Sequence, residues 1–297
     1  MASPSEWFGF LNVDKPAGWT SRKVVDHVQR LVRPAKAGHA GTLDPLAEGV
    51  LVVCLGPATR LVPSLHELPK AYRGEFLCGR SSDTDDIEGD VRELEDAPAL
   101  TRSQLLDVFP RFVGRIAQTP PIYSAVKVKG RRAYTLARRG ELPDLQPRNV
   151  EIYRLELIEF DQPRMVLDIE CSSGTYVRSL GRDIARAAGS DAVMSGLIRT
   201  RIGSFRREAA VSPEEITRDS IARLMIPASA AVSHFTTVVC DDDALDHLRH
   251  GRTMACPPSI KPDDGETCAA VSVSGRLVAI GEFHASGAHI APRHVFP

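Results

Sequence analysis

The sequence of 297 residues is 43% hydrophobic and 25% charged, and its formal net charge is -1. This composition excludes a disordered chain and a protein with apolar membrane spans, and the length suffices for one large domain with a small one beside it. Residues 1–16 lack the basic and then apolar order of a secretory signal. We therefore expect a cytoplasmic protein.

The N-terminal part of the chain mixes strand and helix patterns. Apolar or alternating segments predict strands at residues 9–14, 50–55, 71–78, 151–160 and 165–171. Helical spacing predicts helices at 22–32, 103–109, 131–138 and 176–188, the first capped by Thr20 or Ser21. A glycine-rich loop at 38–45 and an acidic loop at 82–90 separate them. So many strands in succession favour an α+β fold over a doubly wound sheet.

The pattern changes at residues 226–233. Beyond this point, short strands are expected at 238–240, 269–273 and 277–283, with a helix at 242–250 among them. We therefore expect a large domain at residues 1–232, followed by a small β-rich domain at 236–297.

Charge is separated along the chain although the total is near zero. Residues 111–154 carry ten Lys and Arg against three acids, a net charge of +7, and residues 81–99 carry a net charge of -7. A local positive patch is what binding of a phosphate backbone requires. A solvated charged surface has the same pattern, so charge alone leaves both interpretations open.

Neither the cysteines nor the acidic loop predicts a metal site. The six cysteines form no CxxC pair, no histidine cluster lies at zinc spacing, and Cys54 lies in an apolar segment typical of a core. In SDTDDIEGD, which begins at Ser82, Glu88 stands where an EF-hand loop requires Gly. A solvated acidic loop is favoured, and the alternative is a metal-dependent hydrolase built on Asp83, Asp85 and Asp86.

The strongest local motif is GHAGTLDPLAEG, residues 38–49. Three glycines and one proline surround Asp44. Loops on rigid scaffolds are where catalytic groups concentrate, and such a loop can hold one carboxylate in a fixed, partly desolvated position. A turn or a helix cap is the ordinary interpretation of an isolated Asp-Pro, so the residue types alone allow both.

Five sequence blocks span residues 9 to about 205. They are GFLNVDKPAGWTS, GHAGTLDPLAEGVLVVCLGPATR, KAYRGEF with SSDTDDIEGDV, QTPPIYSAVKVKGRRAYTLARRG, and CSSGTYVRSLGRDIA. In this order they resemble blocks of the bacterial tRNA pseudouridine synthases of the TruB family. The resemblance implies the pseudouridine-synthase fold, a mixed and mostly antiparallel sheet flanked by helices. The C-terminal region is similar to a PUA-type RNA-binding module, but residues 208–297 carry a net charge of -5, which disfavours general phosphate binding.

The resemblance gives Asp44 the role of catalytic nucleophile. Pseudouridine formation rejoins a uracil to its ribose through carbon, and a carboxylate can attack either the sugar C1′ or the pyrimidine C6 and later leave. The sequence does not choose between these routes, and the reaction needs no cofactor. Arg178 matches the arginine that pairs with the aspartate and keeps it ionised. Tyr72 matches a tyrosine that stacks on the target base and can assist proton transfer at C5.

Three further residues are expected to bind the substrate together with Tyr72. Tyr176 matches a second pocket tyrosine, since aromatic faces suit a base removed from its stack. Leu197 matches an apolar residue of the uracil pocket, and His39 matches a histidine that fills the gap left by the extruded nucleotide. Without the resemblance, the two tyrosines are typical core residues and His39 an ordinary loop residue.

The basic block corresponds to an inserted loop and helix, at about residues 111–150, that grips an RNA stem-loop, in agreement with its positive charge. The expected RNA contacts are Lys127, Lys129, Arg131, Arg132, Arg138 and Arg139. The implied substrate is a flipped-out uridine at position 55 in the T-loop of tRNA. We expect a monomer that needs no protein partner and no membrane.

Two other RNA-related interpretations stay open on the sequence. A non-catalytic RNA-binding protein on this fold would keep the basic patch but need not keep Asp44, Tyr72 and Arg178, so their presence counts against it. A synthase that works within a guide-RNA particle is the other interpretation, and the lack of long basic tails counts against it.

Overall fold

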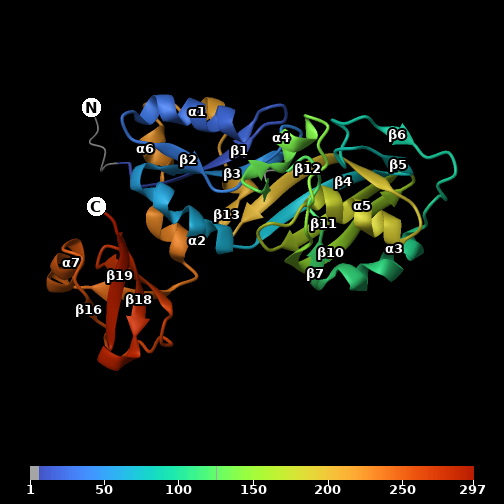
Figure 1. The fold of residues 1–297 in the computed structure, drawn as a ribbon. Coiled ribbons are helices and arrows are strands. Elements are labelled where there is room, and N and C mark those ends of the chain that lie inside the picture. Colours follow the sequence, from blue (N-terminus) through green and yellow to red (C-terminus); the bar gives the residue numbers. More distant parts are fainter. Residues whose placement is uncertain (1–6, 125) are drawn as a thin grey trace.

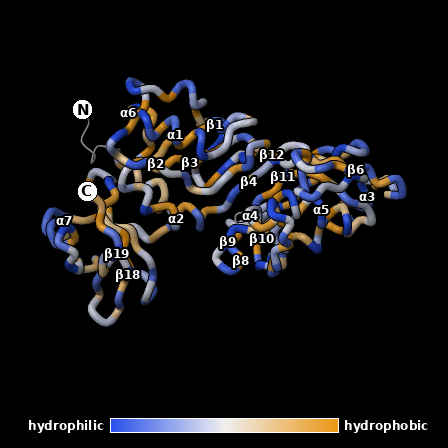
Figure 2. The backbone as a smooth tube through the Cα atoms, turned by 45° about the horizontal axis from the view of Figure 1, so that its top comes forward, coloured by the Kyte–Doolittle hydropathy of each residue, from blue (hydrophilic) through white to orange (hydrophobic). Residues whose placement is uncertain are grey.

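The computed structural model describes residues 7–124 and 126–297. Figure 1 shows an elongated molecule with one large sheet and its helices, and a smaller β body formed by the C-terminal segment, drawn in red. Figure 2 shows that hydrophobic residues are concentrated along the strands and hydrophilic ones along the connecting loops. Among the described residues, no helix is long and apolar enough to cross a membrane.

Within the described chain, the large sheet has ten strands. Eight lie in the order β14 (Ile226–Pro227), β1 (Gly9–Lys15), β3 (Glu48–Leu55), β12 (Ala192–Ile202), β4 (Lys70–Cys78), β11 (Arg164–Cys171), β10 (Arg148–Asp161) and β7 (Gly114–Gln118). The other two are β2 (Ala37–His39), which pairs with β3, and β13 (Phe205–Arg206), which pairs with β12. The pairs are antiparallel except for β12 with β3. The mixed, mostly antiparallel sheet is therefore confirmed.

Helices bury both faces of this sheet. On β1, Leu11 and Val13 pack toward α1 (Ser21–Val32) and α6 (Ile221–Leu224), whereas Phe10 packs toward α2 (Val62–Glu67). This alternation is the period of two expected for a strand. Helices α3 (Arg102–Val108) and α5 (Val177–Ala187) cover the other half of the sheet. Short 3-10 helices lie at Gly56–Leu61, Phe109–Phe112, Arg207–Ala209, Pro213–Glu215, Ala228–Val232 and Ala285–Gly287.

Helix α5 packs unusually close to β4. Its buried face carries Val177, Leu180 and Ile184, the helical spacing of an apolar face. Gly181 lies directly over Phe76 of β4, and a Cβ added there would lie 2.0 Å from the ring. Only glycine permits this approach, which fixes the start of α5 close to the strand that carries Tyr72.

The C-terminal sheet shares a core with the large one. In the described residues its five strands run in the order β15 (Thr236–Cys240), β17 (Thr267–Ser272), β18 (Leu277–His284), β19 (His289–Val295) and β16 (Met254–Ala255), and α7 (Asp242–Arg249) packs on them. Phe296, just after β19, stacks on Phe8 with ring centroids 5.1 Å apart, and both belong to a cluster that includes Phe10 and Leu61. The two sheets are therefore joined by buried apolar contacts.

Most expected elements form within a few residues of their predicted ends, and two local predictions are wrong. The helix expected at 131–138 is shorter, α4 (Ala133–Ala137), because Arg131 and Arg132 form strand β9, paired with β8 (Lys127–Val128). Lys129 and Gly130, at φ 50° and 81°, make the tight turn of this hairpin. Part of the expected glycine-rich loop is strand β2. Strands β12 and β19 had not been predicted.

Smaller elements complete the fold. The segment at 82–90 is a loop, as expected, and its flanks pair as β5 (Arg80–Ser81) and β6 (Arg92–Glu93). The expectation that it is solvated is wrong at Asp85 and Asp86, which are 8% and 3% exposed because both form ion pairs with arginines of α5. Thr20 is the cap of α1, because its side chain accepts a hydrogen bond from the backbone N–H of Lys23. Cys54 is buried in the core, as expected.

Candidate active site

A cavity of about 690 Å³ opens between the large sheet, α5 and the basic insertion. It brings together five of the expected site residues from four separate parts of the chain. These are Asp44 in the loop before β3, Tyr72 on β4, Tyr176 and Arg178 at the start of α5, and Leu197 on β12. The sequence places them up to 153 residues apart, so the sheet order is what makes them neighbours.

Buried hydrogen bonds hold the loop that carries Asp44. The Ser21 hydroxyl donates to the carbonyl of Leu43 (3.0 Å) and accepts from its N–H (2.8 Å). The ammonium of Lys15 donates to the carbonyl of Pro45 (3.3 Å) and to that of Trp19 (2.5 Å). Since a buried amine loses its hydration, burial lowers the pKa of Lys15 to about 8.

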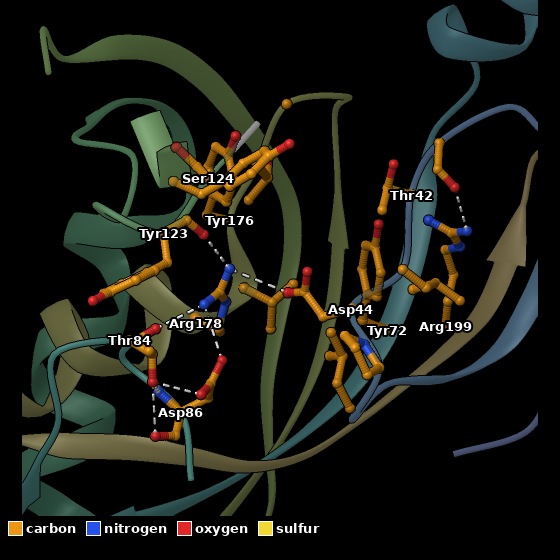
Figure 3. A pocket seen from close by; sticks show the side chains of 18 of the residues that line it. Thr42, Asp44, Tyr72, Thr84, Asp86, Tyr123, Ser124, Tyr176, Arg178 and Arg199 are labelled. Atoms are coloured by element: carbon orange, nitrogen blue, oxygen red, sulfur yellow. Dashed lines mark hydrogen bonds and ion pairs between the residues drawn. The ribbon is translucent and has the colours of Figure 1, made fainter. Parts of the chain in front are cut away.

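Arg178 is buried in the wall of the cavity and forms an ion pair with Asp44. Its Nη2 lies 3.2 Å from Asp44 Oδ2, and its Nη1 lies 2.9 Å from Asp86 Oδ2 (Figure 3). The carbonyls of Thr84 and Tyr123 accept further bonds from the guanidinium. Its side chain is 8% exposed, whereas that of Asp44 is 41% exposed. The carboxylate is therefore accessible to a substrate while its cation is fixed.

The acidic loop supports α5 through two ion pairs. Asp86 pairs with Arg178, and Asp85 pairs with Arg182 one turn later at 2.6 Å. The remaining oxygen of Asp86 accepts from the Thr84 hydroxyl at 2.6 Å. The two carboxylates thus turn toward different arginines, which disfavours the metal-dependent hydrolase built on this segment. No cluster of three metal-ligating side chains occurs among the residues described.

The two tyrosines contribute aromatic surface to the cavity. Tyr72 lies beside Asp44 on the β4 wall (Figure 3). Burial raises the pKa of the Tyr72 hydroxyl, and the neighbouring Arg199 guanidinium opposes this shift. Tyr176 is the residue before α5, on the other side of the cavity. A planar ring therefore stands on each side of Asp44, and Leu197 adds a nearly buried apolar contact.

His39 does not line this cavity. It lies on β2, opposite Val53 of β3. Burial lowers the pKa of its imidazole, and the positive charge of Arg199 adds to the effect. A neutral ring is suited to stacking and poorly suited to phosphate binding.

The basic residues divide into two groups. Arg132 and Arg138 line the cavity together with Tyr134, and their guanidinium carbons lie 6.0 and 5.7 Å from its ring centroid. Arg131 instead pairs with Glu141 at 3.0 Å. Lys127, Lys129 and Arg139 lie on the hairpin and after α4, away from the cavity lining.

Sequence reasoning missed several buried polar residues around the site. Arg199, 2% exposed, donates to the carbonyls of Val50 and Gly41 and thereby joins β12 to the Asp44 loop. Lys70 donates to the carbonyls of His66 and Leu68 at the end of α2, and burial lowers its pKa to about 8. Lys70 stands in the KAYRGEF block, but nothing in the local pattern marks either residue as buried, because an isolated Arg or Lys in a strand pattern is normally exposed.

Solved structures share this fold over nearly the whole chain. A crystal structure of a Cbf5–Nop10–Gar1 complex superposes with a TM-score of 0.75 at 28% identity and covers 99% of this chain and 86% of that one. The structure of an H/ACA RNP bound to a substrate RNA containing 2'-deoxyuridine has a TM-score of 0.75 at 26% identity, with the same coverage of 99% and 86%. The architecture is the pseudouridine synthase fold.

The sequence comparisons specify the family. The profile of the TruB family pseudouridylate synthase N-terminal domain matches residues 29–177. The tRNA pseudouridine synthase B of Bradyrhizobium diazoefficiens is 38% identical over 97% of this chain and 85% of its own length. That of Chelativorans sp. is 39% identical over 97% of this chain and 95% of its own length. The chain belongs to the TruB family of pseudouridylate synthases.

Proposed function

We propose that this protein converts the uridine at position 55 in the T-loop of tRNA to pseudouridine. The observation that carries the proposal is the accessible Asp44 carboxylate, paired with buried Arg178 in a cavity with aromatic walls. Relatives named tRNA pseudouridine synthase B, which match almost the full chain, support tRNA as the substrate. A uridine reaches such a cavity only when it is flipped out of the T-loop stack.

Asp44 acts as the nucleophile in this proposal. Its carboxylate attacks C1′ or C6, the N1–C1′ bond breaks, the base turns, and a C5–C1′ bond forms. N1 gains a proton, C5 loses one, and the carboxylate leaves unchanged. Substrate and product are isomers, so the balance requires no cofactor and no metal.

The neighbouring residues each hold one part of the nucleotide or the nucleophile. Arg178 orients the Asp44 carboxylate, since a fixed cation in a low-dielectric wall stabilises a negative charge there. Tyr72 stacks on the uracil and assists proton transfer at C5. Tyr176 and Leu197 bound the base, and His39 fills the gap left in the RNA stack.

RNA is gripped outside the cavity by the basic insertion. Arg132 and Arg138, which already face the cavity, contact the phosphates next to the flipped nucleotide. Lys127, Lys129, Arg131 and Arg139 extend this contact along the stem. In the same proposal, residues 1–232 form the catalytic domain and residues 236–297 a PUA-like module that adds a few contacts to RNA.

The protein works alone in the cytoplasm as a monomer in this proposal. The related chain in the Cbf5–Nop10–Gar1 complex is assembled with other proteins, but it is less similar to this chain than the relatives named tRNA pseudouridine synthase B are. Activity of the purified chain on tRNA, without guide RNA or partner, is therefore part of the claim.

The test is to incubate unmodified tRNA transcripts with wild type and Asp44→Asn, without added metal or cofactor. Carbodiimide labelling, read by primer extension and mass spectrometry, locates pseudouridine. We expect one T-loop product with wild type and a rate at least about 10³-fold lower with Asp44→Asn. The dissociation constant for tRNA should change by less than about twofold, because Asn keeps the size of the side chain.

Asp161→Asn, at an exposed aspartate that ends β10, is the matched control and should keep full activity. Tight binding by all three proteins without any product would favour the non-catalytic RNA-binding protein. Loss of activity on adding a chelator would favour the metal-dependent hydrolase. Activity only after a guide RNA is supplied would favour the particle-bound synthase.

A further inference from the structure

Gln118 makes a paired contact with the backbone of Tyr176. It is the last residue of β7, and its side chain is buried, with the residue 2% exposed. Its Nε2 donates to the carbonyl of Tyr176 at 3.0 Å, and its Oε1 accepts from the Tyr176 N–H at 2.8 Å. One amide thus satisfies both backbone groups of a single residue 58 positions away.

The contact lies at a helix start without a capping side chain. Within the described residues, Tyr176 is the N-cap of α5 and makes no side-chain cap bond of its own. Ser, Thr, Asp or Asn usually fixes this position. Here Gln118 fixes the backbone of Tyr176 instead. Arg178, in the turn that follows, is held separately by Asp86 and by two backbone carbonyls.

The same amide lies at the root of the basic insertion. Gln118 pairs with Arg148, so residues 119–147 leave the sheet and return to it at this point. Arg178 makes a second tie, because its Nη2 donates to the carbonyl of Tyr123 at 3.1 Å. Gln118 therefore connects the start of the insertion to the wall of the cavity that carries Tyr176.

We infer that Gln118 is a positioning residue for pseudouridine formation, which acts by fixing the backbone of Tyr176 beside the bound uracil. The inference rests on the proposed function. Catalytic geometry tolerates displacements of only about 0.5 Å, and a shift of about 1 Å can cost about 100-fold in rate. Loss of both hydrogen bonds frees Tyr176 to move by such an amount, while the backbone pairing of Gln118 with Arg148 still holds the root of the insertion.

The chain offers a matched control for this contact. Gln29 on α1 makes the same paired contact with backbone, donating to the carbonyl of Ala35 at 2.7 Å and accepting from the N–H of Ala37 at 2.8 Å. Neither Gln29 nor its two partners line the cavity. Gln29→Met and Gln118→Met therefore remove the same chemistry at two places.

The experiment measures single-turnover pseudouridine formation on T-loop tRNA, the tRNA dissociation constant and thermal unfolding for both variants. Both proteins should unfold at lower temperature than wild type. The rate should fall about 10- to 100-fold for Gln118→Met alone, with tRNA affinity within about twofold of wild type. Gln29→Met should react within about twofold of the wild-type rate. Equal rates for the two variants would overturn the inference.

A double-mutant cycle separates positioning from general loss of structure. In a Tyr176→Ala background, Gln118→Met should lower the rate by less than about twofold, because the ring that it positions is absent. A further tenfold loss in that background would contradict the inference. If Gln118→Met does not fold, Gln118→Glu takes its place, because it keeps the acceptor and loses the donor. An inactive wild type would instead reject the proposed function.

Discussion

The loop that carries Asp44 and the basic insertion line the same cavity, and they are held in different ways. Ser21 and Lys15 fix the loop through hydrogen bonds to its backbone in the protein interior. The insertion contains a hairpin, whose strands β8 and β9 have two residues each, and the five-residue helix α4. Arg131 and Glu141 form an ion pair there, and both side chains are about half exposed.

The difference fits two kinds of task. A nucleophile must be held in one orientation before the substrate arrives, because reorganisation during the reaction costs rate. Phosphate contacts act through charge over several ångströms, are screened by salt, and tolerate motion of the side chains that make them. Substitutions under Asp44 should therefore change the rate of the reaction, and substitutions in the insertion should change RNA affinity.

After Asp44→Asn, the largest effect is expected for Arg178→Lys. A lysine has one nitrogen where Arg178 uses two to reach Asp44 and Asp86, so one carboxylate loses its partner. We expect kcat to fall about 100-fold or more, with little change in KM. Single-turnover and steady-state assays on tRNA measure both.

Arg182→Lys is the control for this prediction. Arg182 pairs with Asp85 on the same helix and the same acidic loop, but it does not reach Asp44. Arg182→Lys should lower the free energy of unfolding without a comparable loss of kcat. Equal losses of kcat would mean that the helix as a whole, and not the contact with Asp44, sets the rate.

A smaller effect is expected for Ser21→Ala. Its hydroxyl makes both hydrogen bonds to Leu43, next to the nucleophile, and leaving buried backbone groups unpaired costs about 1–3 kcal/mol. We expect urea unfolding to show a free energy of unfolding that is lower by this amount, and we expect kcat to be lower than in wild type. Ser172→Ala removes a similar bond, to the N–H of Glu151 at the exposed end of a hairpin, and should leave kcat unchanged. An unaffected kcat in Ser21→Ala would show that the loop holds its shape without this anchor.

In the insertion, Arg132→Gln should weaken tRNA binding more than Arg131→Gln does. Arg132 faces the cavity, whereas Arg131 is engaged by Glu141. We expect Arg132→Gln to lower the slope of log Kd against log salt by about one, with kcat at saturating tRNA nearly unchanged. Filter binding at several salt concentrations measures the slope. An identical slope in both variants would place the RNA contact elsewhere.

The sequence predicted the residues that act on the substrate better than the residues that hold them in place. The glycine-rich motif around Asp44 and the GTYVR motif of Tyr176 and Arg178 are local, and their resemblance to a known family located them before any fold was known. The partners that hold them are not local. Gln118 lies 58 residues from Tyr176, and Arg199 lies 158 residues from Gly41. Only the sheet order brings such pairs together, so no local pattern could indicate them.

Secondary structure was hardest to predict where local and tertiary signals disagree. Strand β12 reads AVMSGLIRTRI, with a glycine and two arginines that weaken a strand pattern, yet it lies between β3 and β4 in the centre of the sheet. In the insertion, apolar spacing over 131–138 suggested a longer helix, and the turn at Lys129 and Gly130 prevailed. Turn geometry with positive φ at two successive residues overrides a weak helical pattern.

The smallest and most specific effect concerns Lys15, which lies fully buried under the Asp44 loop. Burial lowers its pKa to about 8 from an ordinary 10.5. Between these two pH values the unfolded chain binds a proton that the folded chain does not, so raising the pH favours the folded state. Below about pH 8 both states are protonated, and the cost of burying the charge is present in full.

Wild type should therefore gain stability relative to Lys15→Met as the pH rises from about 8 to 10.5. Other titrating groups cancel in the difference between the two proteins, which urea unfolding at pH 7, 8, 9 and 10 would measure. A difference that rises with pH places the anchor of the Asp44 loop in a dry interior, in contrast to the solvated charges of the insertion. A difference that stays flat would mean that water reaches Lys15, and the contrast between the two regions would then rest on hydrogen bonds alone.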